Sequence, residues 1–210
     1  MYAPEPFAVI DPDEIDRLLS AARLGALVTH GAEGFWASHL PFLHEAGEGR
    51  LIGHLARPNP QHRLSPAGAE ALVIFTGVDA YVSPNWYPSK AVHGKQVPTW
   101  NYEAVHVHGR LSWFDGPERL LDVVAKLSDR FETGRPAPWS VSDAPETYIR
   151  SMLRGIVGVE VTVERVFAKR KLSQNKDSED FAGVLAGLEA AEDAGAAETA
   201  AAMRALAPRG

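Results

Sequence analysis

The sequence predicts an α+β protein whose antiparallel strands close into a barrel, with helices at its periphery. Three observations lead to this fold class. Short apolar segments alternate with glycine-rich turns, such as G-A-E-G at 31–34 and E-A-G-E-G at 45–49, as in antiparallel hairpins. Valines alternate with polar residues along 159–164, as in a strand with one exposed face. Helix-start signals occur at only a few places between these segments.

The first helix is predicted to begin at Asp11. Asp11 can cap the helix, Pro12 suits its first turn, and Glu14 stands three residues after the cap. We expect this helix to end near Gly25. The apolar residues that share its buried face are Ile15, Leu18, Leu19 and Ala22.

Strands are expected to dominate the chain from there to residue 114. The sequence Arg57-Pro58 breaks one strand, and Asn59-Pro60 looks like the cap and first residue of a short helix. The expected strands cover 26–30, 35–43, 50–56, 71–75, a segment that begins or continues at 81–83, and a long bent strand at 99–114.

The last hundred residues are predicted to be mixed. D-G-P-E at 115–118 begins a helix, a short helix follows at 145–154, and 156–167 reads as a half-exposed strand. Helix resumes from Asp177. Large apolar residues are scarce beyond Leu188, so we expect a frayed helix or disorder there. The predicted organisation is a barrel domain with a C-terminal helical extension at 1–188 and an Ala/Glu-rich tail at 189–210.

The composition is that of an ordinary globular protein. The 210 residues are 45% hydrophobic and 23% charged, and they include no cysteine, which excludes disulfides, thiolate metal sites and a cysteine nucleophile. We expect a cytoplasmic protein, because the N-terminus lacks a signal peptide and no apolar run has membrane-spanning length. The net charge of −6 disfavours non-specific DNA binding by the whole surface.

The stretch at 83–108 is the most unusual part of the sequence. It contains two aromatic pairs, Trp86/Tyr87 and Trp100/Tyr102, and its only acidic residue is Glu103. A long loop in a compact domain is usually functional or disordered, and the aromatic residues argue against disorder. Two interpretations stay open: a cationic, aromatic loop that binds a flat anionic ligand, or a proline-pinned loop whose tryptophans cover one end of the barrel.

Few short motifs carry chemistry on their own. The glycines at 47–53 lack the spacing and context of a dinucleotide fingerprint, and neither a phosphate loop nor a nucleophile elbow is present. His106 and His108 share one face of a strand, but two histidines are a weak metal signal, and a solvent-facing or hydrogen-bonded pair is the simpler interpretation.

A phosphate seat is a sharper candidate. Arg57 and Asn59 stand where a strand runs into a short helix, which offers a guanidinium fork beside free backbone N–H groups. The alternative is a surface turn with a solvated arginine. Lys90 and Lys95 can add charge from the loop, and 169–171 form a third cationic cluster that is too small to favour nucleic acid.

Many ordered motifs resemble one protein family. They are M-Y-A-P-E-P-F at 1–7, L-V-T-H-G at 27–31, S-H-L-P-F at 38–42, G-H-L-A-R-P-N-P-Q at 53–61, A-Y-V-S-P-N-W-Y-P-S-K at 80–90, V-P-T-W-N-Y at 97–102, V-H-V-H-G at 105–109, G-R-P-A-P-W at 134–139 and K-L-S-Q-N at 171–175. Together they make residues 1–190 similar to the PaiB-type FMN-binding negative transcriptional regulators.

This resemblance implies a fold, a cofactor and a site. The fold is an FMN-binding split β-barrel of the pyridoxamine-phosphate-oxidase-like kind, normally a homodimer with FMN at the subunit interface. The residues expected to contact FMN, by motif position and chemistry, are Ser38, His39, Leu40, Pro41, Arg57, Asn59, Lys90, Thr99, Trp100, Asn101, Gln174 and Asn175.

Three functions follow as alternatives. The first is a cytoplasmic FMN-binding regulator with a DNA or regulatory protein partner. The second is a flavin-dependent oxidoreductase that acts on an unidentified small molecule. The third is a flavin-free DNA-binding or protein-binding regulator that has kept only the barrel. The sequence contains no recognisable helix-turn-helix, and fold analogy does not decide among these activities.

Overall fold

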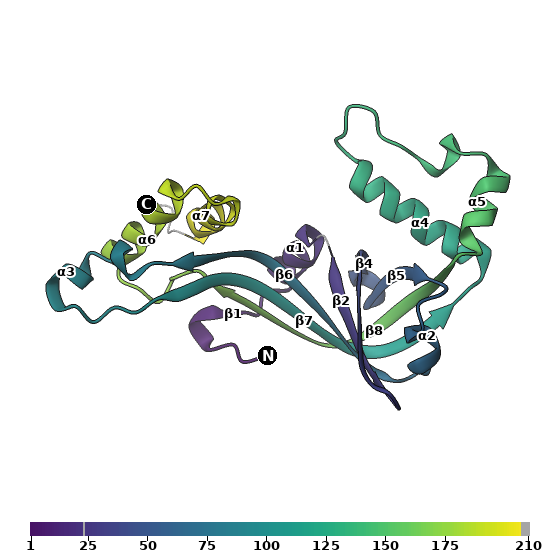
Figure 1. The fold of residues 1–210 in the computed structure, drawn as a ribbon, viewed down its shortest axis with the longest axis horizontal. Helices are drawn as coiled ribbons and strands as arrows, with labels where there is room; N and C mark the ends of the chain where they lie inside the picture. Colours follow the sequence, from purple (N-terminus) through teal and green to yellow (C-terminus); the bar gives the residue numbers. More distant parts are fainter. Residues whose placement is uncertain (23, 207–210) are drawn as a thin grey trace. The chain divides into compact units, whose positions relative to one another are not determined.

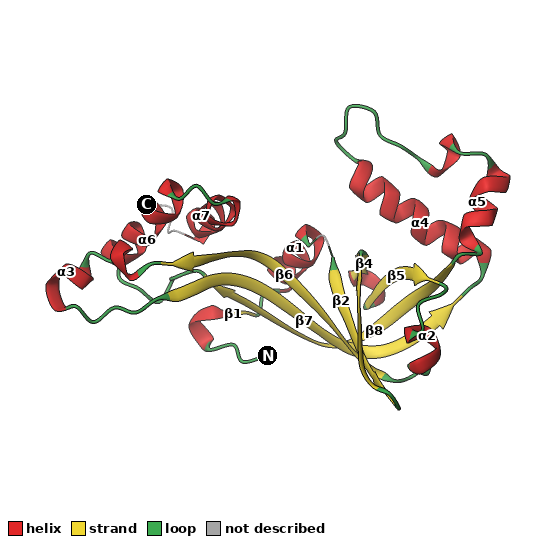
Figure 2. Ribbon diagram, viewed as in Figure 1, coloured by secondary structure: helices red, strands yellow, loops and turns green. Residues whose placement is uncertain are grey.

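The computed structural model describes residues 1–22 and 24–206. Within these residues, the strands form an eight-stranded sheet in the order β3-β2-β6-β7-β8-β5-β4, and β1 pairs with β8 (Figure 2). The registers of β1 with β8, β2 with β3 and β6, and β5 with β4 and β8 are all antiparallel. The predicted α+β class with an antiparallel sheet is therefore confirmed.

The chain divides into two compact units. We call Met1–Leu18, Thr76–Val105 and Phe167–Gly210 the terminal unit, and Leu19–Phe75 and His106–Val166 the central unit. Three long strands contribute residues to both units, and they lie next to one another in the sheet (Figure 1). These strands are β6 (Glu70–Val82), β7 (Thr99–Phe114) and β8 (Ile156–Lys171).

The central unit contains most of the short strands. Its other elements are β2 (Gly25–Gly31), β3 (Gly34–Leu40), β4 (Phe42–Glu45), η2 (Ala46–Glu48), β5 (Arg50–Ala56), α2 (Gln61–Leu64), α4 (Pro117–Glu132), η4 (Val141–Asp143) and α5 (Glu146–Leu153). Alternate strand residues point inward, so Leu27, Leu51, Val73 and Val159 are fully buried. On the other side of β5, Ile52 packs against Val123 and Leu127 of α4.

The terminal unit is built around a second apolar cluster. Its elements are η1 (Glu5–Phe7), β1 (Ala8–Val9), η3 (Pro84–Trp86), α3 (Ser89–His93), α6 (Ser178–Ala190) and α7 (Ala194–Leu206), while α1 (Pro12–Ala21) begins in it. Helices α6 and α7 place Val184, Leu188 and Met203 against Val82 and Leu172 of the strand region.

A glycine allows the close packing of α6. A Cβ at Gly187 would collide with the indole ring of Trp86, and one at Gly183 would collide with the Trp86 carbonyl. The helix therefore presents two glycines, one turn apart, to the segment that carries Trp86. This packing covers part of the apolar cluster, so Trp86 has a structural role against α6.

The strand bounds differ from the predicted ones at two places: at a proline, and where two predicted segments form one long strand. The strand predicted at 35–43 is divided into β3 and β4 at Pro41, because proline has no N–H to donate to a ladder. The segments predicted at 71–75 and 81–83 are one strand, β6. The connection after residue 83 contains η3 and α3, and β7 has the predicted bounds of 99–114.

The expectation of a frayed or disordered tail is wrong for residues 194–206. These residues form α7, in which Ala196, Thr199, Ala200 and Met203 are buried. The small alanine side chains let α7 lie close to its neighbours, so one methionine suffices as the large apolar contact. Residues 207–210 of the predicted tail lie outside the described residues. In the part of the chain that the structure describes, no helix is long and apolar enough to cross a membrane.

Candidate functional site

The first group of predicted residues lies in the central unit, where β3 and β5 end. Asn59 follows β5, and its amide Nδ2 donates to Ser38 Oγ on β3 at 2.8 Å. The Asn59 side-chain oxygen accepts from the backbone N–H of Gln61 at 3.0 Å and so forms a turn that leads into α2. Two residues 21 positions apart in the sequence are thus brought into direct contact, as expected of members of one site. We call Ser38, Arg57, Asn59 and Gln61 the β5–α2 corner.

Arg57 is anchored by the backbone rather than freely solvated. Its Nε donates to the carbonyl of Arg154 at 2.8 Å and its Nη2 donates to the carbonyl of Ile156 at 2.9 Å. Its Nη1 lies 3.9 Å from a carboxylate oxygen of Asp115. The guanidinium is therefore held in one orientation and keeps donors that can still bind an anion, since it has five N–H groups in all.

The strand end beside Asn59 has both buried and exposed side chains. His39 is exposed and Leu40 is buried, as the alternation along β3 requires. The carbonyl oxygen of Pro41 would lie 2.8 Å from a Cβ at position 53, so Gly53 of β5 is needed for this close approach. Pro41 thus sits where the backbone of the β3–β4 bend is pressed against β5.

Gln61 is a site candidate that the sequence reasoning did not single out. Its side chain is fully buried, and Nε2 donates to the carbonyl of Leu27 at 3.1 Å and to Thr29 Oγ1 at 3.0 Å. Its Oε1 is buried and has no hydrogen-bond partner among the described residues. The run P-N-P-Q was recognised in the sequence, but burial of a glutamine directly after a proline carries no periodic signal.

The second group of predicted residues lies in the terminal unit, at the start of β7. The ammonium group of Lys171 donates to Thr99 Oγ1 at 2.6 Å and to the carbonyl of Trp100 at 2.5 Å. Burial lowers the pKa of Lys171, and the neighbouring Lys169 and Lys176 lower it further. Trp100 is 49% exposed, and its indole N–H donates to Asp79 at 2.8 Å. A stacking face and a cation therefore lie together here.

Asn101 and Gln174 are engaged with the turn that follows β8. The Asn101 amide and the Ser173 hydroxyl exchange hydrogen bonds at 3.0 and 3.1 Å. Gln174 accepts from the backbone N–H of Leu172 at 2.7 Å and donates to the carbonyl of Arg170 at 2.5 Å. These amides fix the turn, so any contact with a ligand comes in addition to a structural role. Asn175, next along, is exposed.

The loop that carries Lys90 is held by a buried carboxylate. Both the backbone N–H and the hydroxyl of Ser89 donate to Asp180, at 3.0 and 2.7 Å, and Gln96 donates to Asp180 at 3.0 Å. Burial, the largest single influence, raises the pKa of Asp180. The hydrogen bonds from Ser89 act in the opposite direction, and the net effect is a lowered pKa. Lys90 itself donates to the Asn85 side chain.

Each group offers chemistry that FMN can use. The β5–α2 corner offers a hydroxyl, an amide and an oriented guanidinium, which suit phosphate and ribityl oxygens. Gln61 Oε1, an unpartnered acceptor among the described residues, suits a ribityl hydroxyl. The β7 start offers the exposed Trp100 ring beside the Lys171 cation. The six predicted residues of each group lie within one unit.

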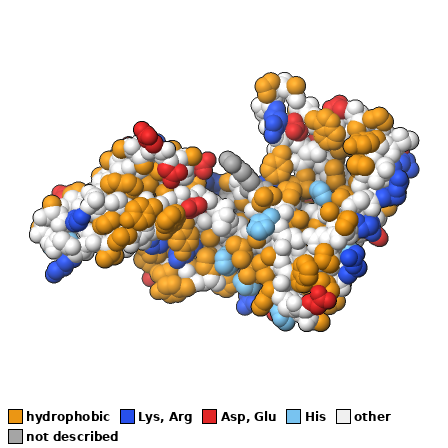
Figure 3. Space-filling model, viewed as in Figure 1, with side chains coloured by type: hydrophobic (Ala, Val, Ile, Leu, Met, Phe, Trp, Pro, Cys, Tyr) orange, Lys and Arg blue, Asp and Glu red, His pale blue; other side chains and the backbone are white. Residues whose placement is uncertain are grey.

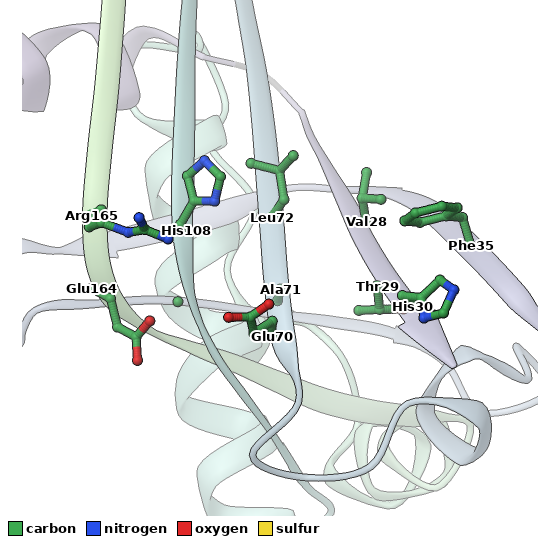
Figure 4. Close-up of a pocket in the computed structure, with 11 residues that line it drawn as sticks. Val28, Thr29, His30, Phe35, Glu70, Ala71, Leu72, His108, Glu164 and Arg165 are labelled. Atoms are coloured by element: carbon green, nitrogen blue, oxygen red, sulfur yellow. The ribbon is translucent and has the colours of Figure 1, made fainter. Parts of the chain in front are cut away.

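An open face of the sheet in the central unit carries a shallow cavity of about 200 Å³ (Figure 4). Side chains from adjacent strands line it, including Val28, His30, Phe35, Leu72 and Arg165. The rings of His30 and Phe35 meet edge to face at 4.7 Å, and Phe35 is 79% exposed.

Comparisons with known proteins agree with this chemistry. Residues 1–165 match the protein family described as "Putative FMN-binding domain". The Bacillus subtilis (strain 168) "Protease synthase and sporulation protein PAI 2" is 34% identical over 202 residues, which is 95% of each chain. The "FAD and Heme binding protein" of Mycobacterium smegmatis has a TM-score of 0.59 at 17% identity, covering 78% of this chain and 73% of that one. The "Flavocytochrome Anf3" of Azotobacter vinelandii has a TM-score of 0.56 at 14% identity, covering 83% and 74%. The fold is the split β-barrel that the sequence predicted.

Proposed function

Because this chain belongs to the FMN-binding family of PaiB-type proteins, and FMN is therefore its cofactor, we propose that it is a cytoplasmic, homodimeric negative regulator of transcription. The observation that carries the proposal is the 34% identity to PAI 2 across 95% of both chains, which leaves no large part of either protein without a counterpart. A protein partner fits better than direct contact with DNA, because the net charge is −6.

The β5–α2 corner is the proposed seat of the phosphate. Arg57 supplies the charge, and its two backbone hydrogen bonds remove most of the entropy cost of orienting the guanidinium. Ser38 and Asn59 supply a hydroxyl and an amide that already face each other. His39, Leu40 and Pro41 contribute the adjoining strand end. Lys90, which lies in the terminal unit, stays a predicted FMN contact.

The β7 start and the turn after β8 are the proposed contacts for the flavin ring. Trp100 offers an exposed aromatic face and Thr99 a hydroxyl, while Gln174 and Asn175 border the same strand ends. Asn101 is fully buried and bonded to Ser173, so it supports this surface from below. When bound, FMN supplies reversible electron transfer, and the surrounding contacts set its potential. Lys171 would favour an anionic ring by its charge.

The homodimer is proposed to use the open sheet face of the central unit. An isologous interface must be complementary to itself, so it needs apolar area and charges of both signs. The face offers Phe35 and Val28 as apolar contacts, Glu70 and Glu164 as acids, and Arg165 as a base (Figure 4). Hydrophobic side chains and histidines also occupy much of the surface drawn in Figure 3.

Genetic disruption in the source organism tests the regulatory role. If the protein is a negative regulator, transcripts of its target genes should rise in the disrupted strain and return to the wild-type level when the gene is restored. Unchanged transcripts, together with steady NADH- or NADPH-dependent reduction of the bound FMN by the purified protein, would reject the regulator and identify an oxidoreductase instead.

A further inference from the structure

A second cavity in the central unit lies between β5, α4 and the segment after α4. Its volume is about 270 Å³. A dry cavity of roughly 150 Å³ holds a benzene ring, so this one has room for a single substituted ring. The residues that matter for its chemistry are Pro41, His54, Leu127, Phe131, Glu132 and Trp139.

His54 provides the polar group of this cavity. Its Nδ1 is buried and has no hydrogen-bond partner among the described residues, and the residue lines the cavity. Burial lowers the pKa of His54, which keeps the ring neutral at pH 7. A buried N–H without an acceptor is rarer than a buried acceptor without a donor, so the proton is expected on Nε2.

Two aromatic side chains lie at the mouth of the cavity. Trp139 is 42% exposed and Phe131 is 39% exposed, so both present ring surface that the protein itself does not cover. The Trp139 backbone N–H donates to Glu132 Oε2 at 3.0 Å, which fixes the segment that carries Trp139 against the end of α4. The Glu132 carboxylate also places a negative charge at the mouth, with Arg135 3.5 Å away.

We propose that this cavity binds a small uncharged aromatic ring that carries one hydroxyl group, with the ring against Phe131 and Trp139 and the hydroxyl oxygen on His54. A hydroxyl suits His54 because it accepts from an N–H and also donates to a bare ring nitrogen. An anionic ligand is disfavoured because its charge would lose water against the apolar walls, while the Glu132 carboxylate is already paired with Arg135. The inference does not depend on FMN, although Pro41 borders both this cavity and the proposed phosphate seat.

Phenol is the probe that tests the proposal, with benzoate as the charged analogue. Saturation-transfer NMR on the full chain, with and without saturating FMN, should give a measurable phenol Kd and at least about tenfold weaker benzoate binding. His54→Phe keeps the ring volume but removes both nitrogens, and should weaken phenol binding about fivefold. Trp139→Ala should weaken phenol binding as well, and it should leave the fold intact because the Trp139 side chain is partly exposed. His93→Phe, an exposed histidine that does not line the cavity, is the matched control.

Each other outcome overturns the proposal. Phenol that does not bind, or that binds His54→Phe and Trp139→Ala as tightly as the wild type, does not occupy this cavity. If His54→Phe fails to fold, Trp139→Ala decides alone. Phenol displaced by FMN would assign the cavity to the flavin. Whether the protein binds FMN at all is measured separately, by an FMN titration in the absence of phenol.

Discussion

Arg57 has a structural role in addition to the binding role proposed for it. Its Nε and Nη2 donate hydrogen bonds to the carbonyls of Arg154 and Ile156, and these bonds tie the start of β8 to the end of β5. Such anchoring positions the rest of the fork without the entropy cost that a solvated arginine would have on binding. The sequence predicted the phosphate role but not the anchor, because a carbonyl about a hundred residues away leaves no local pattern.

Arg57→Ala should therefore weaken FMN binding by about tenfold or more, as expected for loss of a charge-assisted contact to a phosphate. An FMN titration at a temperature where the variant is folded measures this. Arg150→Ala is the control, because Arg150 pairs only with Glu146 on the exposed surface of α5. Equal FMN affinity in Arg57→Ala and wild type would remove Arg57 from the phosphate seat.

His54 makes a prediction about pH. Burial lowers its folded pKa below 6.5, so between the unfolded and folded pKa values the unfolded chain binds the extra proton. Stability should then fall as pH drops below about 6.5. His106 and His108, whose pKa values are also lowered chiefly by burial, act in the same direction.

Urea unfolding between pH 8 and roughly pH 5.5, above the range in which carboxylates titrate, measures this dependence. His54→Phe should lose less stability over that range than the wild type does. His93→Phe, which alters an exposed ring on α3, should keep the wild-type slope. Parallel curves for wild type and His54→Phe would show that His54 does not carry a burial penalty.

At the scale of elements, the pairing of strands follows from local patterns, whereas the packing of the last helix does not. The turns at 31–34 and 46–49 were predictable because glycine permits their backbone conformation. Strand β7 was also predicted with its bounds. The break at Pro41 and the continuity of β6 depend on neighbouring strands, which a single sequence does not display. The close packing of α7 was not predicted because its contacts are mostly alanine, and alanine gives no amphipathic stripe.

The packing of α7 predicts a large cost for Met203→Ala. Met203 is 0% exposed and belongs to the cluster with Leu172, Val184 and Leu188. Truncation of a buried methionine costs about 2–5 kcal/mol in unfolding free energy, which chemical denaturation resolves. Arg204→Ala, which removes an exposed pair with Glu189, should cost about 1 kcal/mol or less. A Met203→Ala effect as small as that of Arg204→Ala would restore the weakly packed tail that the sequence suggested.

At the scale of the whole molecule, the sequence named candidate site residues one by one but not how they come together. The structure places Ser38 and Asn59, from two of the motifs, in direct contact. Gln61 was not singled out because its role comes from burial in the folded structure. The hydrogen bonds that Gln174 makes within its turn follow from the positive φ of Ser173 just before it. The contact of each predicted residue with FMN stays a prediction.

Dimerisation through the open sheet face predicts a change of mass on one substitution. The wild type should sediment at twice 22.8 kDa, and Phe35→Asp should shift it toward the monomer, because the charge would be buried against its own copy. Val92→Asp, at an equally exposed apolar residue on α3, should leave the dimer intact. A wild-type monomer, or a Phe35→Asp dimer, would contradict the proposed interface.

The most direct test is the absorbance spectrum of the purified protein after incubation with FMN and desalting. FMN is the premise on which the phosphate seat, the ring contacts and the regulatory proposal all depend. We predict that the flavin absorption band is retained, at about one FMN per chain, and that Arg57→Ala loses it. A protein that emerges free of flavin after incubation with excess FMN would contradict the account, because the β5–α2 corner would then hold no phosphate.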